Sequence, residues 1–105
     1  MDINQFTQKA QEAIYQSQQL ARDYGHQTIE PAHLLLALLQ QPEGVVPAVI
    51  TKVAGNTQAL LQEVKKDLDN RPKISGWSGE VGFSQATAQV LEAAERFAKG
   101  MQDDF

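Results

Sequence analysis

The longest run of apolar residues lies near the middle of the first half of the chain. From Leu34 to Leu39 there is no polar side chain, so a helix formed there is apolar on every face. Such a helix is buried on all sides or crosses a membrane. A crossing needs about 20 apolar residues, and this run is far shorter. Because Pro31 suits the first turn of a helix, the pattern predicts a central core helix from Pro31 to Leu39, capped by Glu30.

An amphipathic helix is predicted before it, within residues 1–25. Apolar and small side chains recur there at steps of three and four, which is typical of one face of a helix. Asp2 or Asn4 could cap its start, and Gly25 is well placed to end it in a left-handed conformation. The predicted buried face consists of Phe6, Ala10, Ala13, Ile14, Ser17, Leu20, Ala21 and Tyr24.

Three further helices are predicted after the core helix. The third covers about residues 45–54 and ends at Gly55, and the fourth runs from an Asn56 cap to about Leu68. Ser84 caps the fifth helix. Its predicted apolar face consists of Val90, Leu91, Ala94, Phe97, Ala98 and Met101. No segment alternates with period two for long enough to predict a strand, so the fold class is all-α.

The first and fifth helices repeat each other at an offset of 83 − 6 = 77 residues. Phe6 then matches Phe83, Thr7 matches Ser84, and the apolar faces coincide, which indicates a duplicated unit. We therefore predict a first helical repeat at 1–69, a Gly- and Pro-containing linker at 70–82, and the start of a second repeat at 83–105. Because the second repeat would stop before its own core helix, we expect a fragment with a pseudo-twofold fold.

The overall composition excludes several function classes. Among 105 residues, 9 are basic and 13 acidic, which gives a net charge of −4 without any basic cluster. Nucleic-acid binding needs a positive face, so it is not expected. No cysteine is present, which excludes disulfides, thiolate metal sites and a Cys nucleophile. The polar, acidic start of the chain is not a signal peptide, and we expect no membrane interaction and a cytoplasmic protein.

No enzymatic site is predicted from the residue patterns. Glu30 and His33 have the spacing of half a di-iron motif, but the second pair that such a site needs is missing. Asp103 and Asp104 are interpreted as solvated, and no phosphate-binding loop occurs. We therefore expect no catalytic residue, no metal and no cofactor in this chain. Trp77 and Val81 could form a peptide-binding patch, but we favour their packing the linker against the core.

Two stretches resemble a known family. Phe6-Thr7-Gln8-Lys9-Ala10 and the run from Ile29 to Leu39 closely resemble the N-terminal domain of the Clp ATPase family, which is a tandem repeat of four-helix units. The segments Gly44–Pro47 and Arg71–Gly76, and the Phe83-Ser84-Gln85 opening of the second repeat, are most similar to the disaggregase branch of that family. The resemblance covers the whole chain.

The resemblance implies a function in substrate capture. Disaggregases of this family are hexameric AAA+ machines that use ATP and magnesium and cooperate with a DnaK-type chaperone system. Their N-terminal domain binds exposed hydrophobic stretches of unfolded or aggregated polypeptides and is not itself an ATPase. By position, Thr7, Leu91 and Asp103 correspond to residues of its substrate groove. The alternative is the adaptor-docking N-terminal domain of a Clp protease unfoldase; a helical metalloenzyme is a third, more distant hypothesis.

Overall fold

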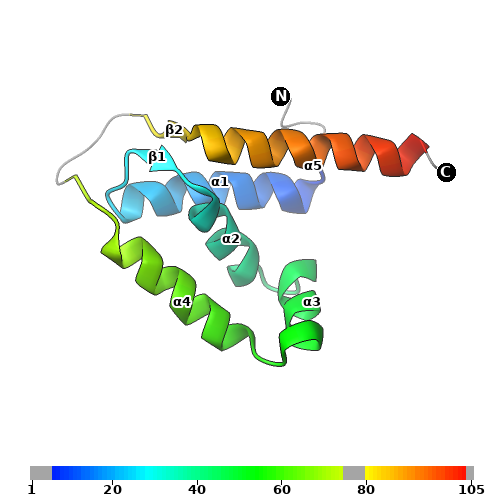
Figure 1. Cartoon of the computed structure of the whole chain (residues 1–105), viewed down its shortest axis with the longest axis horizontal. Coiled ribbons are helices and arrows are strands. Elements are labelled where there is room, and N and C mark those ends of the chain that lie inside the picture. The colour runs from blue at the N-terminus through cyan, green and yellow to red at the C-terminus, as the bar shows by residue number, and fades with distance from the viewer. Residues whose placement is uncertain (1–5, 75–79, 104–105) are drawn as a thin grey trace.

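The computed structural model describes residues 6–74 and 80–103, and for residues 98–103 it describes the helical backbone alone. Within these ranges the chain forms five helices and two very short strands (Figure 1). The helices are α1 (Gln8–Asp23), α2 (Pro31–Gln40), α3 (Val45–Ala54), α4 (Thr57–Asn70) and α5 (Gln85–Asp103), and the strands are β1 (Thr28–Ile29) and β2 (Gly82–Phe83). The predicted all-α class is confirmed.

The two strands were not predicted. β1 and β2 pair in parallel, with Thr28 opposite Gly82 and Ile29 opposite Phe83. A strand of two residues cannot show the alternation by which strands are recognised in a sequence. Its effect is nevertheless specific, because it places the start of α5 beside the loop between α1 and α2.

The cap of α1 differs from the prediction. Thr7 is the N-cap residue, and its Oγ1 accepts a hydrogen bond from the Ala10 N–H at 3.2 Å. The prediction of Asp2 or Asn4 was wrong, since the helix begins at Gln8, and both of those residues lie outside the described ranges. At the other end, Gly25 has a φ of 76°, which confirms the predicted left-handed stop.

Helix α2 lies at the centre of the molecule, as predicted, but it is not buried on all sides. His33, Leu36, Ala37 and Leu39 are buried, whereas Leu34, Leu35 and Leu38 are half-buried. The helix packs most extensively against α1 and α4, with smaller contacts to α3 and α5 (Figure 1). These neighbours do not enclose α2 completely, so one flank keeps part of its apolar surface in contact with solvent.

The caps predicted for the later helices are confirmed. Gly55 ends α3 with a φ of 77°. Asn56 Oδ1 accepts the Gln58 N–H at 2.9 Å at the start of α4, which continues to Asn70, two residues beyond the predicted end. Ser84 Oγ accepts the Thr87 N–H at 3.2 Å at the start of α5. Each cap satisfies a backbone donor or carbonyl that the helix itself leaves without a partner.

The buried residues form two clusters. The larger joins α1, α2 and α4, and its buried members are Ala13, Leu20, Leu36, Ala37, Leu39, Val64 and Leu68. The smaller joins Ala21, Ile29 and Val81, with Phe83 packed against it. Val81 is thus an anchor of the predicted linker, as we favoured, while Trp77 lies outside the described residues.

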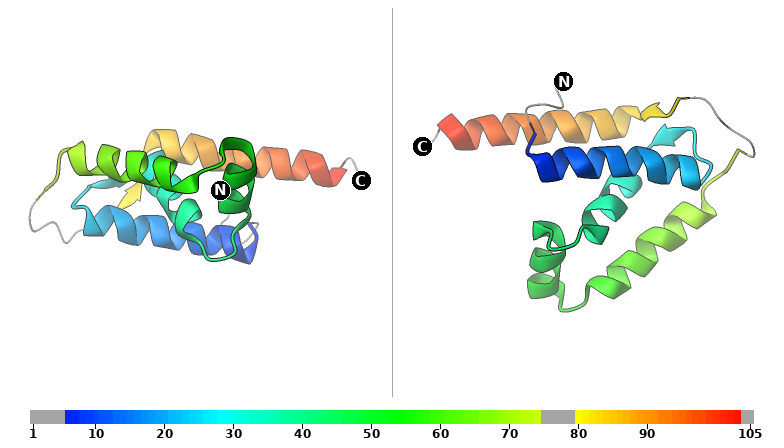
Figure 2. Two further views of the ribbon diagram at one scale, coloured as in Figure 1. Left: turned by 90° about the horizontal axis from the view of Figure 1, so that it is seen from below. Right: turned by 180° about the vertical axis from the view of Figure 1, so that it is seen from behind.

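Figures 1 and 2 show α5 running antiparallel to α1 along the outside, with its C-terminal end projecting.

No single helix among the described residues is long and apolar enough to span a membrane; the consecutive helices α2 and α3 meet the length and composition criteria only as a pair bent by 91°.

Candidate functional site

Thr7 lies at the start of α1 and is exposed to solvent. Its hydroxyl oxygen accepts the Ala10 N–H, so the side chain is oriented by the helix that it caps. A threonine hydroxyl has one donor hydrogen besides its acceptor lone pairs. Capping uses the oxygen as an acceptor, and the donor hydrogen can therefore serve a bound polypeptide carbonyl.

Leu91 and Asp103 are both in α5. The structure describes the side chain of Leu91, but only the backbone of Asp103. Leu91 is buried, with 4% of its surface exposed. Its side chain therefore offers little direct contact surface to a binding partner. Asp103 is the last residue of α5, and its side chain lies outside the described part. The beginning of α1 and the C-terminal half of α5 lie toward the same end of the molecule (Figure 1).

An apolar stripe on α5 is exposed. Val90 is 46% and Phe97 is 75% exposed, and Ala94 between them is also exposed. Residues spaced by four and three lie on one face of a helix. We call Val90, Ala94 and Phe97 the α5 stripe; the sequence analysis assigned all three to the apolar face of this helix, and the structure leaves them exposed.

The internal repeat shows why this exposure is unusual. At the offset of 77, the α5 stripe corresponds to Ala13, Ser17 and Leu20 of α1, which are buried against neighbouring helices. The two helices otherwise start alike, since Thr7 and Ser84 each cap with the same 3.2 Å bond to the backbone N–H three residues on. The helix face that is buried in the first repeat is therefore exposed on α5, where none of the described residues covers it.

A second apolar stripe was missed by the sequence analysis. Val45, Val49 and Val53 follow one another at steps of four in α3 and are 76%, 48% and 81% exposed. The signal was present in the spacing. It was not recognised because α3 is apolar on most of its surface, and the pattern alone does not say which side packs on the core.

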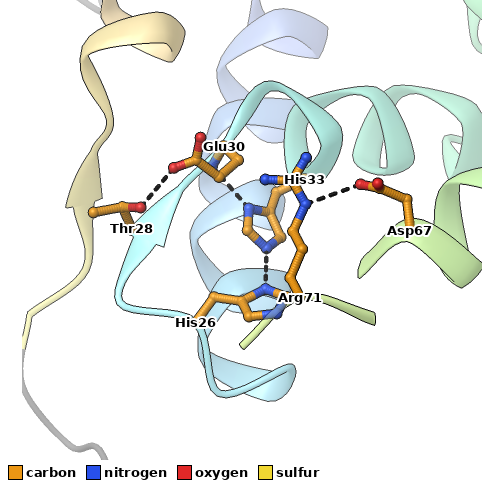
Figure 3. A network of polar contacts seen from close by, with 6 residues as sticks. All are labelled: His26, Thr28, Glu30, His33, Asp67 and Arg71. Carbon is orange, nitrogen blue, oxygen red and sulfur yellow. Dashed lines mark hydrogen bonds and ion pairs between the residues drawn. The ribbon is translucent and has the colours of Figure 1, made fainter. Parts of the chain in front are cut away.

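The most ordered polar cluster lies elsewhere, where α2 begins (Figure 3). His33 Nδ1 accepts the Glu30 N–H at 2.8 Å, and His33 Nε2 lies 2.7 Å from His26 Nδ1. Since His33 Nδ1 is an acceptor, its proton is on Nε2 and is donated to His26. His26 Nδ1 is then also an acceptor, and His26 carries its own proton on Nε2. His33 is fully buried, so this hydrogen bonding takes place away from solvent.

Both imidazoles are neutral in this arrangement. Burial, then the neighbouring imidazole and Arg71, lower the pKa of His33 to about 4, with Glu30 acting in the opposite direction. Burial, then Lys73 and Arg71, lower the pKa of His26; the Leu68 backbone and Glu30 act against this. His26 Nε2 is buried without a hydrogen-bond partner of standard geometry among the described residues. Neutral imidazoles suit this place because a buried charge would lack compensation.

A depression of about 270 Å³ lies beside His26. Arg71 forms one side, with its Nε held 2.9 Å from Asp67 Oδ2, and Glu30 forms another, with Oε2 accepting the Thr28 hydroxyl at 2.6 Å (Figure 3). Its lining consists of His26, Gln27, Thr28, Glu30, Arg71, Pro72 and Ile74. No group of three or more metal-ligating side chains occurs in the described part of the chain.

The chain matches a known protein family over almost its whole length. The family model described as "Clp repeat (R) N-terminal domain" matches residues 5–105. The chain is 40% identical over 105 residues to the chaperone protein ClpB of Porphyromonas gingivalis and to that of Pseudomonas putida. In both cases the match covers 100% of this chain and 12% of the relative.

Among solved structures, the N-terminal domain of the caseinolytic protease-associated chaperone ClpD from Arabidopsis thaliana is similar. The TM-score is 0.67 at 26% sequence identity, and the match covers 97% of this chain and 69% of the other. The chain thus aligns with a small part of the curated chaperones and with most of an isolated N-terminal domain.

Proposed function

Since the chain belongs to the Clp repeat (R) N-terminal domain family, we propose that it captures exposed hydrophobic segments of unfolded or aggregated proteins for a ClpB-type AAA+ chaperone. The observation that carries the proposal is the α5 stripe. Its three side chains have the spacing of a helix face that packs against other helices, yet the Phe97 side chain is 75% exposed. Exposed apolar patches of this kind typically mark interaction surfaces. The relatives named above are chaperones.

The expected binding is weak and tolerant of sequence. Covering apolar surface gains about 25 cal/mol per Å², and ordering a flexible partner opposes that gain. A stripe of three side chains thus favours brief contacts, which suit a domain that must pass its substrate on. Thr7 would donate to the substrate backbone, Asp103 would attract basic residues near the bound segment, and Leu91 would support the groove from below.

The whole protein's activity follows as part of the proposal. The chain spans 12% of the length of the ClpB relatives, and the ATPase modules would reside in the rest of such a protein. In this proposal the ATPase modules bind ATP and magnesium and assemble the protein into a hexamer. The whole protein cooperates with a DnaK-type chaperone system and is located in the cytoplasm. The chain itself is the non-catalytic N-terminal domain.

The test is a binding titration of the isolated chain with a permanently unfolded protein, carboxymethylated α-lactalbumin, followed by backbone NMR. We expect shifts to cluster on α5 and at Thr7, and Phe97→Ser to weaken binding at least several-fold. Val53→Ser is the matched control, since it removes an equally exposed apolar side chain from α3. Binding that depends on Val53 and not on Phe97, or no shifts in a folded sample, would contradict the proposal.

Asp103 needs its own test. Asp103→Ala should weaken capture of the unfolded protein while leaving the thermal unfolding midpoint unchanged. An equal loss of thermal stability would instead make Asp103 a structural residue.

Adaptor docking is the second candidate, and the likeness to the N-terminal domain of the protease-associated chaperone ClpD is compatible with it. An adaptor is a folded protein that binds with fixed stoichiometry. Adaptor docking is the function if the chain does not bind the unfolded probe but binds a folded partner one-to-one, and if Phe97→Ser does not change the affinity for that folded partner.

A further inference from the structure

The His26–His33 pair has no place for an additional proton. His33 Nδ1 is filled by the Glu30 N–H, and the single proton between the rings occupies the 2.7 Å gap from His33 Nε2 to His26 Nδ1 (Figure 3). A proton added to His33 Nδ1 would face the Glu30 N–H, and one added to His26 Nδ1 would face the proton of His33. Protonation of either ring therefore breaks one of the two hydrogen bonds.

The charges around the pair also oppose a positive imidazole. Arg71 and Lys73, which follow α4, are both cationic and act on His26. Of the nearby carboxylates, Glu30 at the start of α2 accepts the Thr28 hydroxyl, and Asp67 is 2.9 Å from Arg71. Asp69 is 3.6 Å from Lys73, and from the end of α1 the Tyr24 ring stacks on His26 with 5.7 Å between centroids.

The segment Arg71–Ile74 leads from α4 toward β2 and rests on the turn formed by Tyr24, Gly25 and His26. The Ile74 N–H donates to the Gly25 carbonyl at 2.8 Å. Lys73 Nζ lies 5.7 Å from the centre of the Tyr24 ring. These few attachments sit directly beside His26, so a charge appearing on His26 acts on them first.

We propose that the His26–His33 pair is a pH-sensitive latch that holds the segment Arg71–Ile74 on the Tyr24–His26 turn while both rings are neutral. When the pair takes up a proton, one of its hydrogen bonds breaks, and His26 repels Arg71 and Lys73. The segment then leaves the turn, and helices α1, α2 and α4 stay packed because their apolar cluster does not involve it. This loosens the connection between the first helical repeat and β2.

The lowered pKa of each ring determines whether the latch opens on the acid or the alkaline side. A free histidine titrates near 6.5, and burial lowers the pKa of both His26 and His33. The latch is therefore closed at neutral pH and opens in acid, at a pH below 6.5.

The test is an NMR titration of the chain from pH 7.5 to 4.5. We expect the Ile74 amide to lose hydrogen-exchange protection at least tenfold, after correction for the intrinsic pH dependence, with the same midpoint as the His26 ring signals. The Leu36 and Leu68 amides should remain protected through that midpoint. An Ile74 amide that stays protected after His26 titrates would overturn the proposal, and so would simultaneous loss of protection at all three amides.

A pair of charge variants makes the test sharper. Lys73→Met removes a cation that lowers the pKa of His26, so the midpoint for Ile74 release should shift to higher pH than in the parent chain. Lys66→Met is the matched control, because Lys66 is exposed on α4 and does not act on the pair. Equal midpoints in the two variants would contradict an electrostatic latch.

Discussion

Thr87 Oγ1 donates a 2.7 Å hydrogen bond to the Ile29 carbonyl, which lies 58 positions earlier in the chain. The same carbonyl accepts the Ser84 N–H at 3.1 Å. Thr87 is fully buried, so water does not compete for its hydroxyl. One backbone oxygen of β1 thus fixes both the cap and the first turn of α5, and it joins the fifth helix to the first helical repeat.

Replacement of Thr87 by valine should weaken this junction. The Thr87→Val side chain has a similar shape and removes the donor, while the Ile29 carbonyl keeps its bond from Ser84. We expect the free energy of unfolding to fall by about 1 to 2 kcal/mol, measured by urea denaturation. Thr51→Val is the control, since its hydroxyl bonds Pro47 O at an exposed site where water can replace it. Equal losses in the two variants would mean that the buried bond to Ile29 has no special role.

Stability should fall in mild acid because of His33. The folded-state pKa of His33 is lowered to about 4, and the unfolded chain titrates near 6.5. Between these values the unfolded state binds more protons than the folded state, so stability is full above pH 6.5 and decreases as the pH falls toward 4. From pH 7 to pH 5, His33 alone should remove about 2 kcal/mol from the free energy of unfolding.

Urea denaturation at pH 7 and pH 5 measures this change. The comparison is with H33N, whose side-chain oxygen can still accept the Glu30 N–H but does not titrate. The variant should be less stable at pH 7 and should lose about 2 kcal/mol less than the parent chain on going to pH 5. If both proteins lose the same amount, carboxylates rather than His33 cause the acid sensitivity.

Local features were predictable from the sequence. Ser84, Asn56 and Gly55 act within one helical turn of their own position, so their residue types alone indicate where α3 ends and where α4 and α5 begin. Thr7 shows the limit of this reasoning, because three cap-forming residues occur within the first seven positions. Which of them caps α1 depends on where the buried face must start.

Relationships between distant residues were not predictable. His26 and His33 are seven positions apart in a loop and a helix, and their hydrogen bond exists only because α2 turns back beside the end of α1. The exposure of Phe97 has a similar origin. Its spacing places it on the apolar face of α5, but burial requires a packing partner, and periodicity does not reveal whether one is present. The roles of Thr7, Leu91 and Asp103 in substrate binding stay predictions.

The two left-handed glycines allow a final prediction about backbone strain. Gly25 and Gly55 have nearly the same φ, 76° and 77°. A Cβ at Gly55 would meet no atom within 4 Å, and one at Gly25 would meet the Ile74 carbonyl oxygen at 3.4 Å and Lys73 Cβ at 3.5 Å. These are close to ordinary contacts, so the main penalty at both sites is the left-handed backbone, about 1 to 2 kcal/mol for a residue with a side chain.

We therefore expect Gly25→Ala and Gly55→Ala to lower the free energy of unfolding by similar amounts in urea denaturation. Gly82→Ala is the control, because its φ is not positive and its Cβ would meet open space; it should be neutral or slightly stabilising through the reduced entropy of the unfolded chain. A much larger loss for Gly25→Ala than for Gly55→Ala would show that the contact between the Tyr24–His26 turn and Ile74 tolerates no added atom. In that case the segment Arg71–Ile74 would be held by tight packing as well as by its hydrogen bond to Gly25.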